Sequence, residues 1–357
     1  MKRIVGIVLV GLALAAGVVW LNCSALTLRL VDRAAERQLA GDLLDELPDG
    51  LHVAICGAGS PLPDPERSGP CAAILAGDRV FVVDAGAGAS RVLARMDVPQ
   101  GRIAAVFLTH FHSDHIDGLG ELLMQRWVNG GHFEPTPLIG PVGVENVATG
   151  LALAYGADVD YRVVHHGEEI VPRSGAGAVA RSFRTPADGS GLVVWDQGGV
   201  QVTAFRVDHD PVEPAVGYRF DYAGRSAVFS GDTVKSANLE GFASGADLLV
   251  HEALDAKLVG RLTAAAERAG RDDIAKITRD ILDYHTTPVE AAESARAAGV
   301  GFLLYSHIVP PLLIGPMERV FLEGVSEAYE GPVAVARDGT LVVMPAGSDD
   351  IELQELL

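Results

Sequence analysis

Short apolar segments alternate with turns rich in glycine and proline over most of the chain, from residue 51 to residue 344. The segments consist of β-branched and other apolar residues bounded by turn residues, a pattern that predicts β-strands. Alanine-rich stretches at 262–269 and 289–298, and most of 256–284, are predicted to be helical. The predicted strands are residues 52–56, 79–84, 103–109, 200–207, 225–230, 246–250 and 300–305, followed by a closing hairpin of 333–335 and 341–344.

The first 28 residues differ in composition from the rest. After Lys2 and Arg3 the chain carries no charged side chain until Arg29. An apolar stretch of roughly 20 residues can cross a bilayer as a helix, and a basic start is also typical of a secretory signal. We therefore expect a transmembrane anchor or signal segment at residues 1–28. An uncleaved anchor, a cleaved signal and a lipoprotein at Cys23 are the alternatives.

The remaining organisation follows from the same pattern. Residues 29–50 mix charged and apolar side chains and are predicted to form a helical stalk, and residues 346–357 form an acidic tail. Residues 51–345 are expected to be one domain. Every alternative for the N-terminus places this domain outside the cytoplasm. The expected location is therefore periplasmic or at the cell surface, anchored in the inner membrane, or else secreted.

The overall charge argues against nucleic acid as a partner. The chain has 28 basic and 47 acidic side chains, which gives a formal net charge of −19. Sequence-independent binding to nucleic acid needs clustered lysine and arginine against the phosphates. Hydrophobic residues make up 48% of the chain and charged residues 21%, so it is globular rather than disordered. We expect a small-molecule substrate and consider nucleic acid unlikely as a partner; a homodimer is possible.

Two of the three cysteines, Cys56 and Cys71, flank a loop of glycine and proline. In an oxidising compartment they can form a disulfide, which would contribute about 3 kcal/mol by closing the loop. Two small buried thiols are the alternative, and the sequence leaves both interpretations open.

Potential metal ligands follow five of the predicted strands directly or within two residues. They are His110, His209, Asp232, His251 and His307. Side chains at strand ends are held by a rigid scaffold, while the loops that follow are free to shape a pocket. The sequence therefore predicts that these residues meet at one site.

The densest group of candidate ligands comprises His110, His112, Asp114 and His115. Spacings of two, two and one do not follow the 3.6-residue period of a helix, so these side chains cannot share one helical face. They fit a tight loop in which the donors converge. Neutral imidazole together with carboxylate suits zinc, with iron or manganese as alternatives.

Other motifs recur in a fixed order around this group. They are Cys56-Gly57-Ala58-Gly59-Ser60-Pro61, Val83-Asp84-Ala85-Gly86, Val207-Asp208-His209 with Val216-Gly217-Tyr218-Arg219-Phe220, Phe229-Ser230-Gly231-Asp232-Thr233, His251-Glu252-Ala253, His285-Thr286-Thr287 and Ser306-His307. Together with His-x-His-x-Asp-His they resemble the metallo-β-lactamase superfamily over about residues 52–344. Within it, the chain looks closest to the branch that contains ribonuclease Z and arylsulfatase-like hydrolases.

This resemblance implies a four-layer αββα sandwich with two zinc ions per chain at one edge. His110, His112 and His209 would hold the first ion, and Asp114, His115 and His307 the second, with Asp232 as the bridge. The metal pair would lower the pKa of a shared water and present hydroxide near neutral pH. Three further catalytic roles are expected: Asp114 orients the hydroxide, and His251 and His285 protonate the leaving group or support the ligands.

The chain departs from the ribonuclease Z pattern between Phe220 and Asp232. This interval holds only a short turn, 221–224, and one strand, with no counterpart of the long arm that clasps tRNA in that class. The motif His251-Glu252-Ala253-Leu254 ends in leucine where that class usually has threonine. With the net charge and the apolar N-terminus, these departures lead us to expect that tRNA is not the substrate.

The predicted function is a dinuclear zinc hydrolase that attacks an ester-type bond of a small molecule. Sulfate, phosphate and carboxyl esters and lactones are all compatible with the ligands. Residues 122–132 and a flexible lid at 170–196 would form pocket walls, and Trp127, Trp195 and Tyr155 are candidate contacts to an aromatic or apolar substrate. The alternatives are an iron-dependent oxidoreductase of the same fold and a metal-binding accessory protein without turnover.

Overall fold

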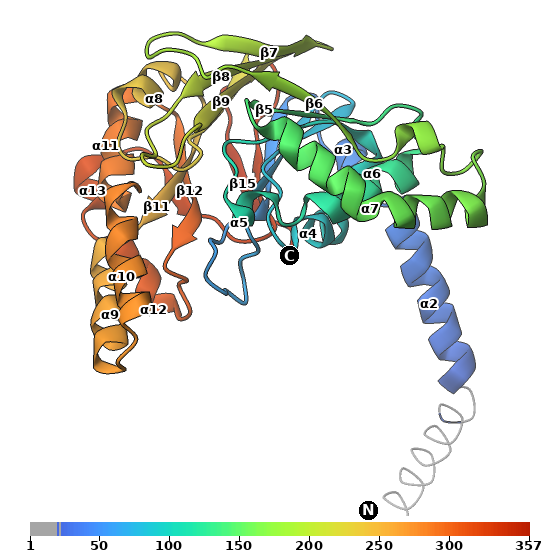
Figure 1. Ribbon diagram of the computed structural model, residues 1–357, viewed down its shortest axis with the longest axis horizontal. Coiled ribbons are helices and arrows are strands. Elements are labelled where there is room, and N and C mark those ends of the chain that lie inside the picture. The colour runs from blue at the N-terminus through green and yellow to red at the C-terminus, as the bar shows by residue number, and fades with distance from the viewer. Residues whose placement is uncertain (1–19, 21–22) are drawn as a thin grey trace, which may run out of the picture. The chain divides into compact units, whose positions relative to one another are not determined.

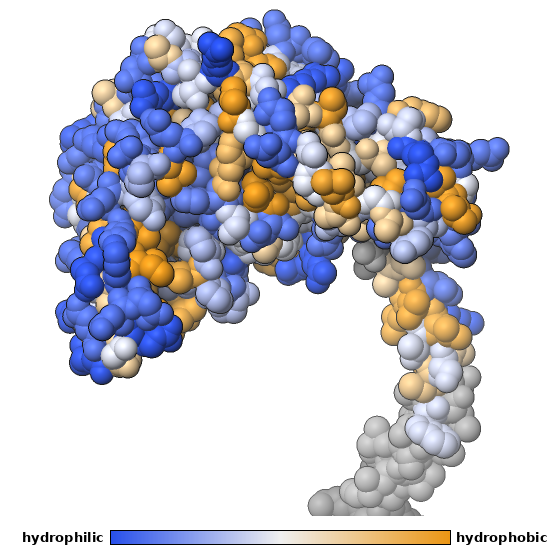
Figure 2. All heavy atoms as spheres, in the orientation of Figure 1, coloured by the Kyte–Doolittle hydropathy of each residue, from blue (hydrophilic) through white to orange (hydrophobic). Residues whose placement is uncertain are grey.

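The computed structural model describes residue 20 and residues 23–357, which divide into two compact units on either side of residue 42. The first unit contains helix α2 (Cys23–Ala40), which falls partly in the segment predicted to be a helical stalk. Apolar side chains are exposed along it, as Figure 2 shows. No helix in the described part of the chain is long and apolar enough to span a membrane. Most of the predicted anchor at 1–28 lies outside the described residues.

The second unit, Leu43–Leu357, is built around two β-sheets (Figure 1). In spatial order the first sheet contains β15 (Glu352–Glu355), β14 (Thr340–Val343), β1 (Leu51–Gly57), β2 (Cys71–Ala76), β3 (Arg79–Val83), β4 (Ile103–Phe107), β5 (Thr136–Pro141) and β6 (Ala178–Phe183). The second contains β13 (Val333–Val335), β12 (Phe302–Val309), β11 (Leu248–Leu254), β10 (Arg225–Phe229), β9 (Val216–Tyr222), β8 (Val200–Arg206) and β7 (Leu192–Gln197).

Helices lie outside the sheets. They are α3 (Leu43–Glu46), α4 (Ala89–Arg95), α5 (Ser113–Ile116), α6 (Leu119–Gly130), α7 (Val144–His166), α8 (Ala237–Phe242), α9 (Ala256–Arg268), α10 (Asp272–Asp280), α11 (Pro288–Ala298), α12 (Gly315–Phe321) and α13 (Val325–Ala328), with short 3₁₀ turns η1 (Gln100–Arg102), η2 (Arg173–Gly175) and η3 (Ile281–Asp283). Helix α11 shows how local sequence fixes such bounds. Thr287 and Glu290 form a capping box at its start, and Gly299 ends it in a left-handed conformation.

Three apolar clusters show that the fold has four layers. Side chains from both sheets, among them Phe81, Phe107 and Phe220, pack between the sheets. A second cluster joins the other face of the first sheet to α4, α6 and α7, and a third joins the other face of the second sheet to α8, α11, α12 and α13. Each sheet is thus buried on both faces, as its apolar strands require. The αββα architecture expected from the sequence is confirmed.

Three segments differ from the sequence-based expectation. Residues 333–335 and 341–344 do not form a hairpin, because β13 pairs with β12 in one sheet while β14 pairs with β1 in the other. The predicted lid at 170–196 contains strands β6 and β7, which also belong to different sheets. Residues 346–357, expected as an acidic tail, include β15, because Ile351 and Leu356 pack against the core.

A disulfide joins Cys56 at the end of β1 to Cys71 at the start of β2. Both side chains are buried. The structure thus contains the pairing that the sequence left open, and the bond closes the loop at residues 57–70. This loop, called here the glycine loop, lies beside the residues described next.

Candidate metal centre

The candidate ligands gather at the carboxyl ends of strands in both sheets. His110, His112, Asp114 and His115 lie on the segment after β4, which continues into α5. His209 follows β8, and Asp232 follows β10. Strands β3 and β4 run parallel in the first sheet, and β10, β11 and β12 run parallel in the second, so within each sheet their carboxyl ends lie at one edge. The 3.4 Å distance from His115 Nε2 to Asp232 Oδ2 shows that the two edges meet. The fold therefore brings residues far apart in sequence to a single place.

His307 lies inside β12 rather than after it, and a β-bulge explains how it reaches the site. Glu252 pairs with Ser306 and Ala253 pairs with Ile308, so His307 is left without a partner residue on β11. Its φ of 48° is in the left-handed region. A bulge re-aims the side chain of the extra residue, and bulges are common beside active sites.

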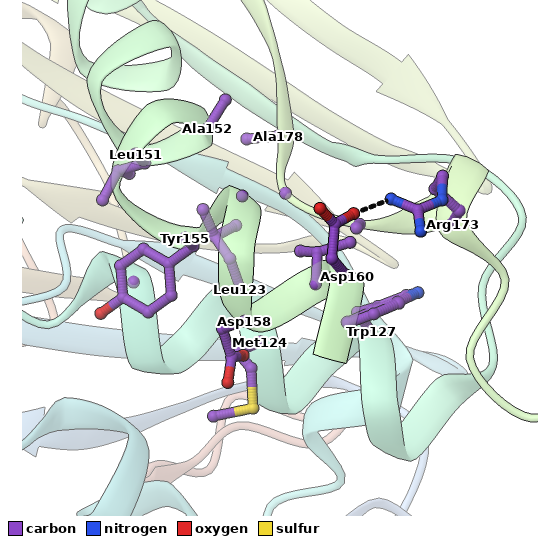
Figure 3. A pocket seen from close by; sticks show the side chains of 15 residues that line it. Leu123, Met124, Trp127, Leu151, Ala152, Tyr155, Asp158, Asp160, Arg173 and Ala178 are labelled. Carbon is purple, nitrogen blue, oxygen red and sulfur yellow. Dashed lines mark hydrogen bonds and ion pairs between the residues drawn. The ribbon is translucent and has the colours of Figure 1, made fainter. Parts of the chain in front are cut away.

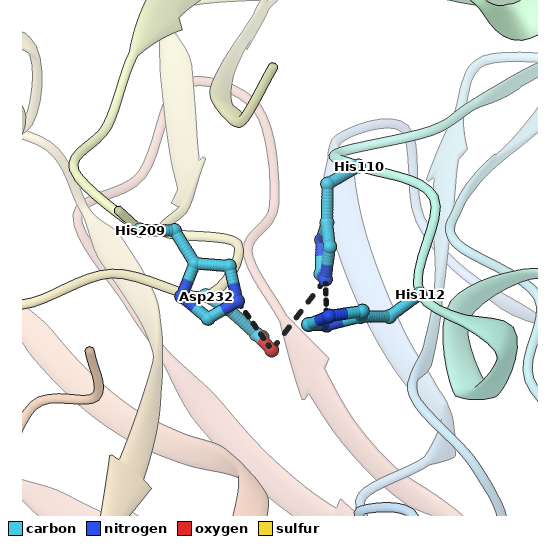
Figure 4. Close-up of side chains that lie close together, drawn as sticks. All are labelled: His110, His112, His209 and Asp232. Atoms are coloured by element: carbon cyan, nitrogen blue, oxygen red, sulfur yellow. Dashed lines mark hydrogen bonds and ion pairs between the residues drawn. The ribbon is translucent and has the colours of Figure 1, made fainter. Parts of the chain in front are cut away.

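The first group of side chains comprises His110, His112, His209 and Asp232 (Figure 4). His110 and His112 approach from one side, and His209 and Asp232 from the other. His110 Nε2 lies 2.9 Å from His112 Nδ1. Asp232 Oδ2 lies 3.8 Å from Nε2 of His110 and also 3.8 Å from Nε2 of His209. Three imidazoles and one carboxylate oxygen thus surround one point.

A second group comprises Asp114, His115 and His307. Asp114 Oδ2 lies 3.3 Å from His307 Nε2 and 3.5 Å from His115 Nε2. Asp232 Oδ2 lies 3.4 Å from Nε2 of each of these two histidines. One carboxylate oxygen therefore lies between the two groups, which is the place of a bridging ligand in a two-metal site.

The chemistry of the two groups fits metal ions. Nε2 of His115 and His209 and Oδ1 of Asp232 are buried without a hydrogen-bond partner in the described structure, although buried polar atoms are nearly always paired. Burial lowers the pKa of His110 well below its usual value and also lowers the pKa of His112 and His209. Neutral imidazole is the form that binds a metal.

Carboxylates oppose the effect of burial on the two histidines of the second group. Burial alone would raise the pKa of Asp232, but the imidazoles of His307 and His115 hold it well below its usual value. Burial likewise disfavours protonated His307, yet Asp232 and Asp114 raise its pKa to about 9. The pKa of His115 is raised by Asp232 and Asp84 against the effect of burial. Metal binding here would displace these protons.

Asp84 fixes the orientation of His115. Its carboxylate accepts hydrogen bonds from the N–H (2.9 Å) and the hydroxyl (2.8 Å) of Thr109, and its Oδ2 lies 2.8 Å from His115 Nδ1. A carboxylate on this nitrogen directs the other, Nε2, toward the ligand group.

Replacing Asp84 with asparagine is therefore expected to weaken metal binding about 10- to 100-fold. The amide lacks the charge that keeps Nδ1 of His115 protonated and directed to it. Zinc titration of the metal-free full-length protein measures the effect. Asp221→Asn, which changes a surface carboxylate paired with Arg219, is the control. Equal zinc affinity of Asp84→Asn and wild type would show that Asp84 does not orient a ligand.

The two histidines considered as proton donors lie in different surroundings. His285 Nδ1 lies 2.9 Å from Glu252 Oε1, and the His285 ring stacks on His307 with 5.6 Å between centroids. His251 is fully buried, and its Nδ1 lies 2.7 Å from the backbone oxygen of Glu252. Successive side chains of a strand point to opposite faces, so the His251 ring points away from the face that carries Glu252.

Glu252 is a site residue that the sequence reasoning missed. Its Oε1 also accepts hydrogen bonds from the N–H groups of Thr233 (3.1 Å) and Thr286 (3.2 Å). Burial lowers the pKa of His285, but Glu252 together with Asp232 outweighs this effect and raises it. The strand alternation in His251-Glu252 is the signal that could have identified it, because only one of the two can face the ligands.

A separate cavity of about 340 Å³ lies between α6, α7 and the start of β6 (Figure 3). Leu123, Trp127 and Tyr155 contribute to its mainly apolar wall, and Asp160 and Arg173 form an ion pair beside it. None of the metal-binding groups in the described residues lines it. This cavity is therefore distinct from the candidate metal centre.

The two tryptophans proposed as substrate contacts have structural surroundings instead. The indole N–H of Trp127 donates a 2.7 Å hydrogen bond to the backbone oxygen of Pro172. Trp195 packs edge-on against Phe81 in the core between the sheets. Both side chains are buried, so packing accounts for them.

Comparison with known proteins identifies the relatives of this chain. Residues 79–308 match the β-lactamase superfamily domain. The chain is 38% identical over 271 residues to a protein of Mycobacterium avium named ribonuclease Z, a match that covers 75% of this chain and 90% of the relative. It is 36% identical over 290 residues to the ribonuclease Z of Mycobacterium bovis, covering 81% and 96%.

Solved structures show the same fold. A metallo-β-lactamase fold protein from Bacillus subtilis superposes with a TM-score of 0.57 at 20% identity, covering 82% of this chain and 99% of that one. The short form of human tRNase Z superposes with a TM-score of 0.56 at 21% identity and the same coverage.

These relatives correct two expectations from the sequence. The sequence led us to expect a small-molecule substrate and to consider nucleic acid unlikely as a partner. This expectation is wrong, because the relatives are named as ribonucleases. Net charge is a sum over the whole chain and does not report the charge at one edge of the fold. The expected location, anchored in the inner membrane or secreted with the domain outside the cytoplasm, is contradicted by the same relatives, which are named ribonuclease Z.

Proposed function

This chain belongs to the metallo-β-lactamase superfamily of hydrolases, and on that premise we propose that it is a dinuclear phosphodiesterase that cleaves RNA. The observation that carries the proposal is the position of Asp232 Oδ2, 3.4–3.8 Å from Nε2 of four histidines in two ligand groups. Imidazole and carboxylate ligands favour zinc as the metal.

The ligand residues have two roles in this proposal, which are to bind the metal ions and to offset part of their positive charge. His110, His112 and His209 would hold one zinc ion, and Asp114, His115 and His307 the other. Two zinc ions held in this way would supply the Lewis-acid chemistry that makes water nucleophilic at neutral pH. The carboxylates of Asp114 and Asp232 would offset part of the positive charge. Asp114 would also accept a hydrogen bond that orients the attacking water.

His285 is the proposed proton donor to the leaving oxygen. As the new bond from water to phosphorus forms, the bond from phosphorus to the ribose oxygen breaks, and that oxygen needs a proton. Glu252 engages Nδ1 of His285, so the proton is delivered from Nε2. His251, turned to the other face of β11, supports packing in this proposal.

The RNA is proposed to lie along the loops at the metal edge. Strands β9 and β10 are joined by a tight turn at Ala223 and Gly224, so no arm extends from them. Two hollows of about 500 and 600 Å³ flank Arg206 and Val207, next to the ligand His209, and Lys235 lines the smaller one. Arg206 pairs with Glu213 at 2.9 Å and Lys235 with Glu293 at 2.6 Å, so in the proposed complex these cations would exchange a carboxylate for a phosphate of the bound strand.

Hydrolysis assays with the full-length protein test this function. The zinc-loaded protein is expected to shorten a 3′-extended RNA and to cleave an aryl phosphodiester, and removal of zinc with a chelator should abolish both activities. An aryl sulfate and an aryl carboxyl ester serve as comparison substrates. Hydrolysis of either comparison substrate without cleavage of RNA would contradict the proposal. Bound iron with oxidation of a substrate would favour the oxidoreductase alternative.

A further inference from the structure

The turn between β13 and β14 reaches from one sheet to the other and contacts the glycine loop. The Asp338 carboxylate accepts hydrogen bonds from the N–H of Ser68 (2.9 and 3.0 Å) and from the N–H of Ala58 (3.3 Å). Asp338 itself donates its backbone N–H to Glu66. One carboxylate thus ties both ends of the loop to this turn.

Arginine side chains reinforce the contact in both directions. Arg67 Nε donates to the backbone oxygen of Ala336 at 3.0 Å, and the Arg67 side chain is 1% exposed. Arg337 pairs with Glu66 at 3.0 Å from the turn side. The glycine loop is therefore held in place by the turn, besides being closed by the disulfide at its ends.

The glycine loop in turn contacts the backbone next to two ligands of the second group. Ile308 donates its N–H to the backbone oxygen of Ala58 at 2.9 Å, directly after the left-handed residue His307. A Cβ on Gly86 would lie 2.6 Å from Gly69 Cα and 2.3 Å from the backbone oxygen of Asp114. Gly86 is thus in close contact with both the loop and the ligand segment.

The first ligand group is positioned by other elements. His110 and His112 follow β4, and His209 Nδ1 lies 2.9 Å from the backbone oxygen of Tyr284. Among the described hydrogen bonds, none joins the glycine loop to these three histidines. The contacts of the loop thus reach His307 and Asp114, and a shift of the loop would displace these two ligands more than the three histidines of the first group.

We propose that Asp338 is a positioning residue for the second metal: through Ala58 and the glycine loop it holds His307 and Asp114 in place. This inference rests on the proposed two-metal site and deepens it. It assigns a role in metal binding to a carboxylate that is not itself a ligand. Loss of Asp338 should weaken one metal site selectively.

Asp247 offers a matched control for this test. Its carboxylate accepts the N–H of Ser226 at 2.7 Å and pairs with buried Arg225 at 3.2 Å, so its bonds are similar in kind to those of Asp338. It precedes β11, whereas the ligands lie at the carboxyl ends of the strands. Asp247→Ala should lower the unfolding temperature without changing either metal affinity.

The metal-free full-length proteins are titrated with Co²⁺, and the absorption of the bound Co²⁺ is followed to measure the affinity of each site. Calorimetry with Zn²⁺ counts the sites. For Asp338→Ala we expect one site to weaken about 10- to 100-fold while the other keeps the wild-type affinity. Asp338→Asn retains an oxygen that accepts the N–H of Ala58 but places an amide N–H₂ group against the N–H of Ser68. We therefore expect a smaller loss of metal affinity at the same site. This milder variant provides the test if Asp338→Ala does not fold.

Two outcomes would overturn the inference. One is a metal affinity that is unchanged at both sites in Asp338→Ala or Asp338→Asn. The other is an equal loss of metal affinity at both sites that Asp247→Ala also shows. Because the titration does not use hydrolysis, it separates this inference from the proposed function. A wild-type protein that binds a single ion would overturn both, and two ions without RNA cleavage would contradict the function alone.

Discussion

Replacing Asp232 with alanine is expected to lower the rate of phosphodiester hydrolysis at least about 10³-fold. Asp232 Oδ2 lies between the two ligand groups, so its removal takes a ligand from both metals at once. A metal pair contributes several kcal/mol of stabilisation to the transition state, and each 1.36 kcal/mol corresponds to tenfold in rate. Steady-state kinetics with the aryl phosphodiester, together with the metal content of each variant, measures this loss.

Asp221→Ala is the matched control for Asp232→Ala. Asp221 is a carboxylate on β9 that pairs with Arg219 and belongs to neither ligand group in the described structure. Its removal changes the net charge equally but should leave the rate within about twofold, since surface substitutions have small effects. A fully active Asp232→Ala protein would rule out the bridging role.

The His285→Ala substitution is expected to reduce kcat on RNA about 10²- to 10⁴-fold, which is the usual contribution of a positioned general acid. The metal content should remain at the wild-type level. The loss should be much smaller on an aryl phosphodiester with a nitrophenolate leaving group, because that group departs without a proton. Equal losses on both substrates would indicate that His285 acts on the ligands and does not donate a proton.

The pH dependence provides a second measurement of the same role. Glu252 raises the pKa of His285, so the donor stays protonated to higher pH than an isolated histidine would. Glu252→Gln removes this effect and should move the alkaline decline of kcat to lower pH. His251→Gln, on the opposite face of β11, should lower stability without moving that decline. A shift in His251→Gln and none in Glu252→Gln would reverse the assignment.

The sequence identified the candidate metal ligands more readily than the structural features that hold them in place. The close spacing of His110, His112, Asp114 and His115 is itself a local signal, so these residues could be identified without the fold. His307 was placed after a strand, although it lies within β12 and reaches the site through a bulge. A bulge depends on the register between two strands, which a single segment does not encode.

Features that depend on how the two sheets are assembled could not be predicted. The turn at residues 336–339 contains the signals of a hairpin, yet β13 and β14 belong to different sheets. The role proposed for Asp338 arises only from that crossing, because its partners Ala58 and Ser68 are distant in sequence. Similarly, the choice between His251 and Glu252 depends on which face of β11 lies toward the ligands.

The net charge of the whole chain was the least reliable guide to function. The net charge of −19 suggested that nucleic acid was excluded, but relatives with the same fold are named as ribonucleases. Charge acts over about 10 Å at ordinary salt concentrations, so the charged side chains along the loops at the metal edge matter more to a bound strand than the total for the chain.

The metal content of the purified full-length protein tests the central claim most directly. Inductively coupled plasma mass spectrometry of the protein, after removal of loosely bound ions, should find about two zinc ions per chain. Asp232→Ala, prepared in parallel, should retain fewer. One ion or none in the wild-type protein, under conditions that saturate zinc sites, would contradict a dinuclear centre organised around Asp232.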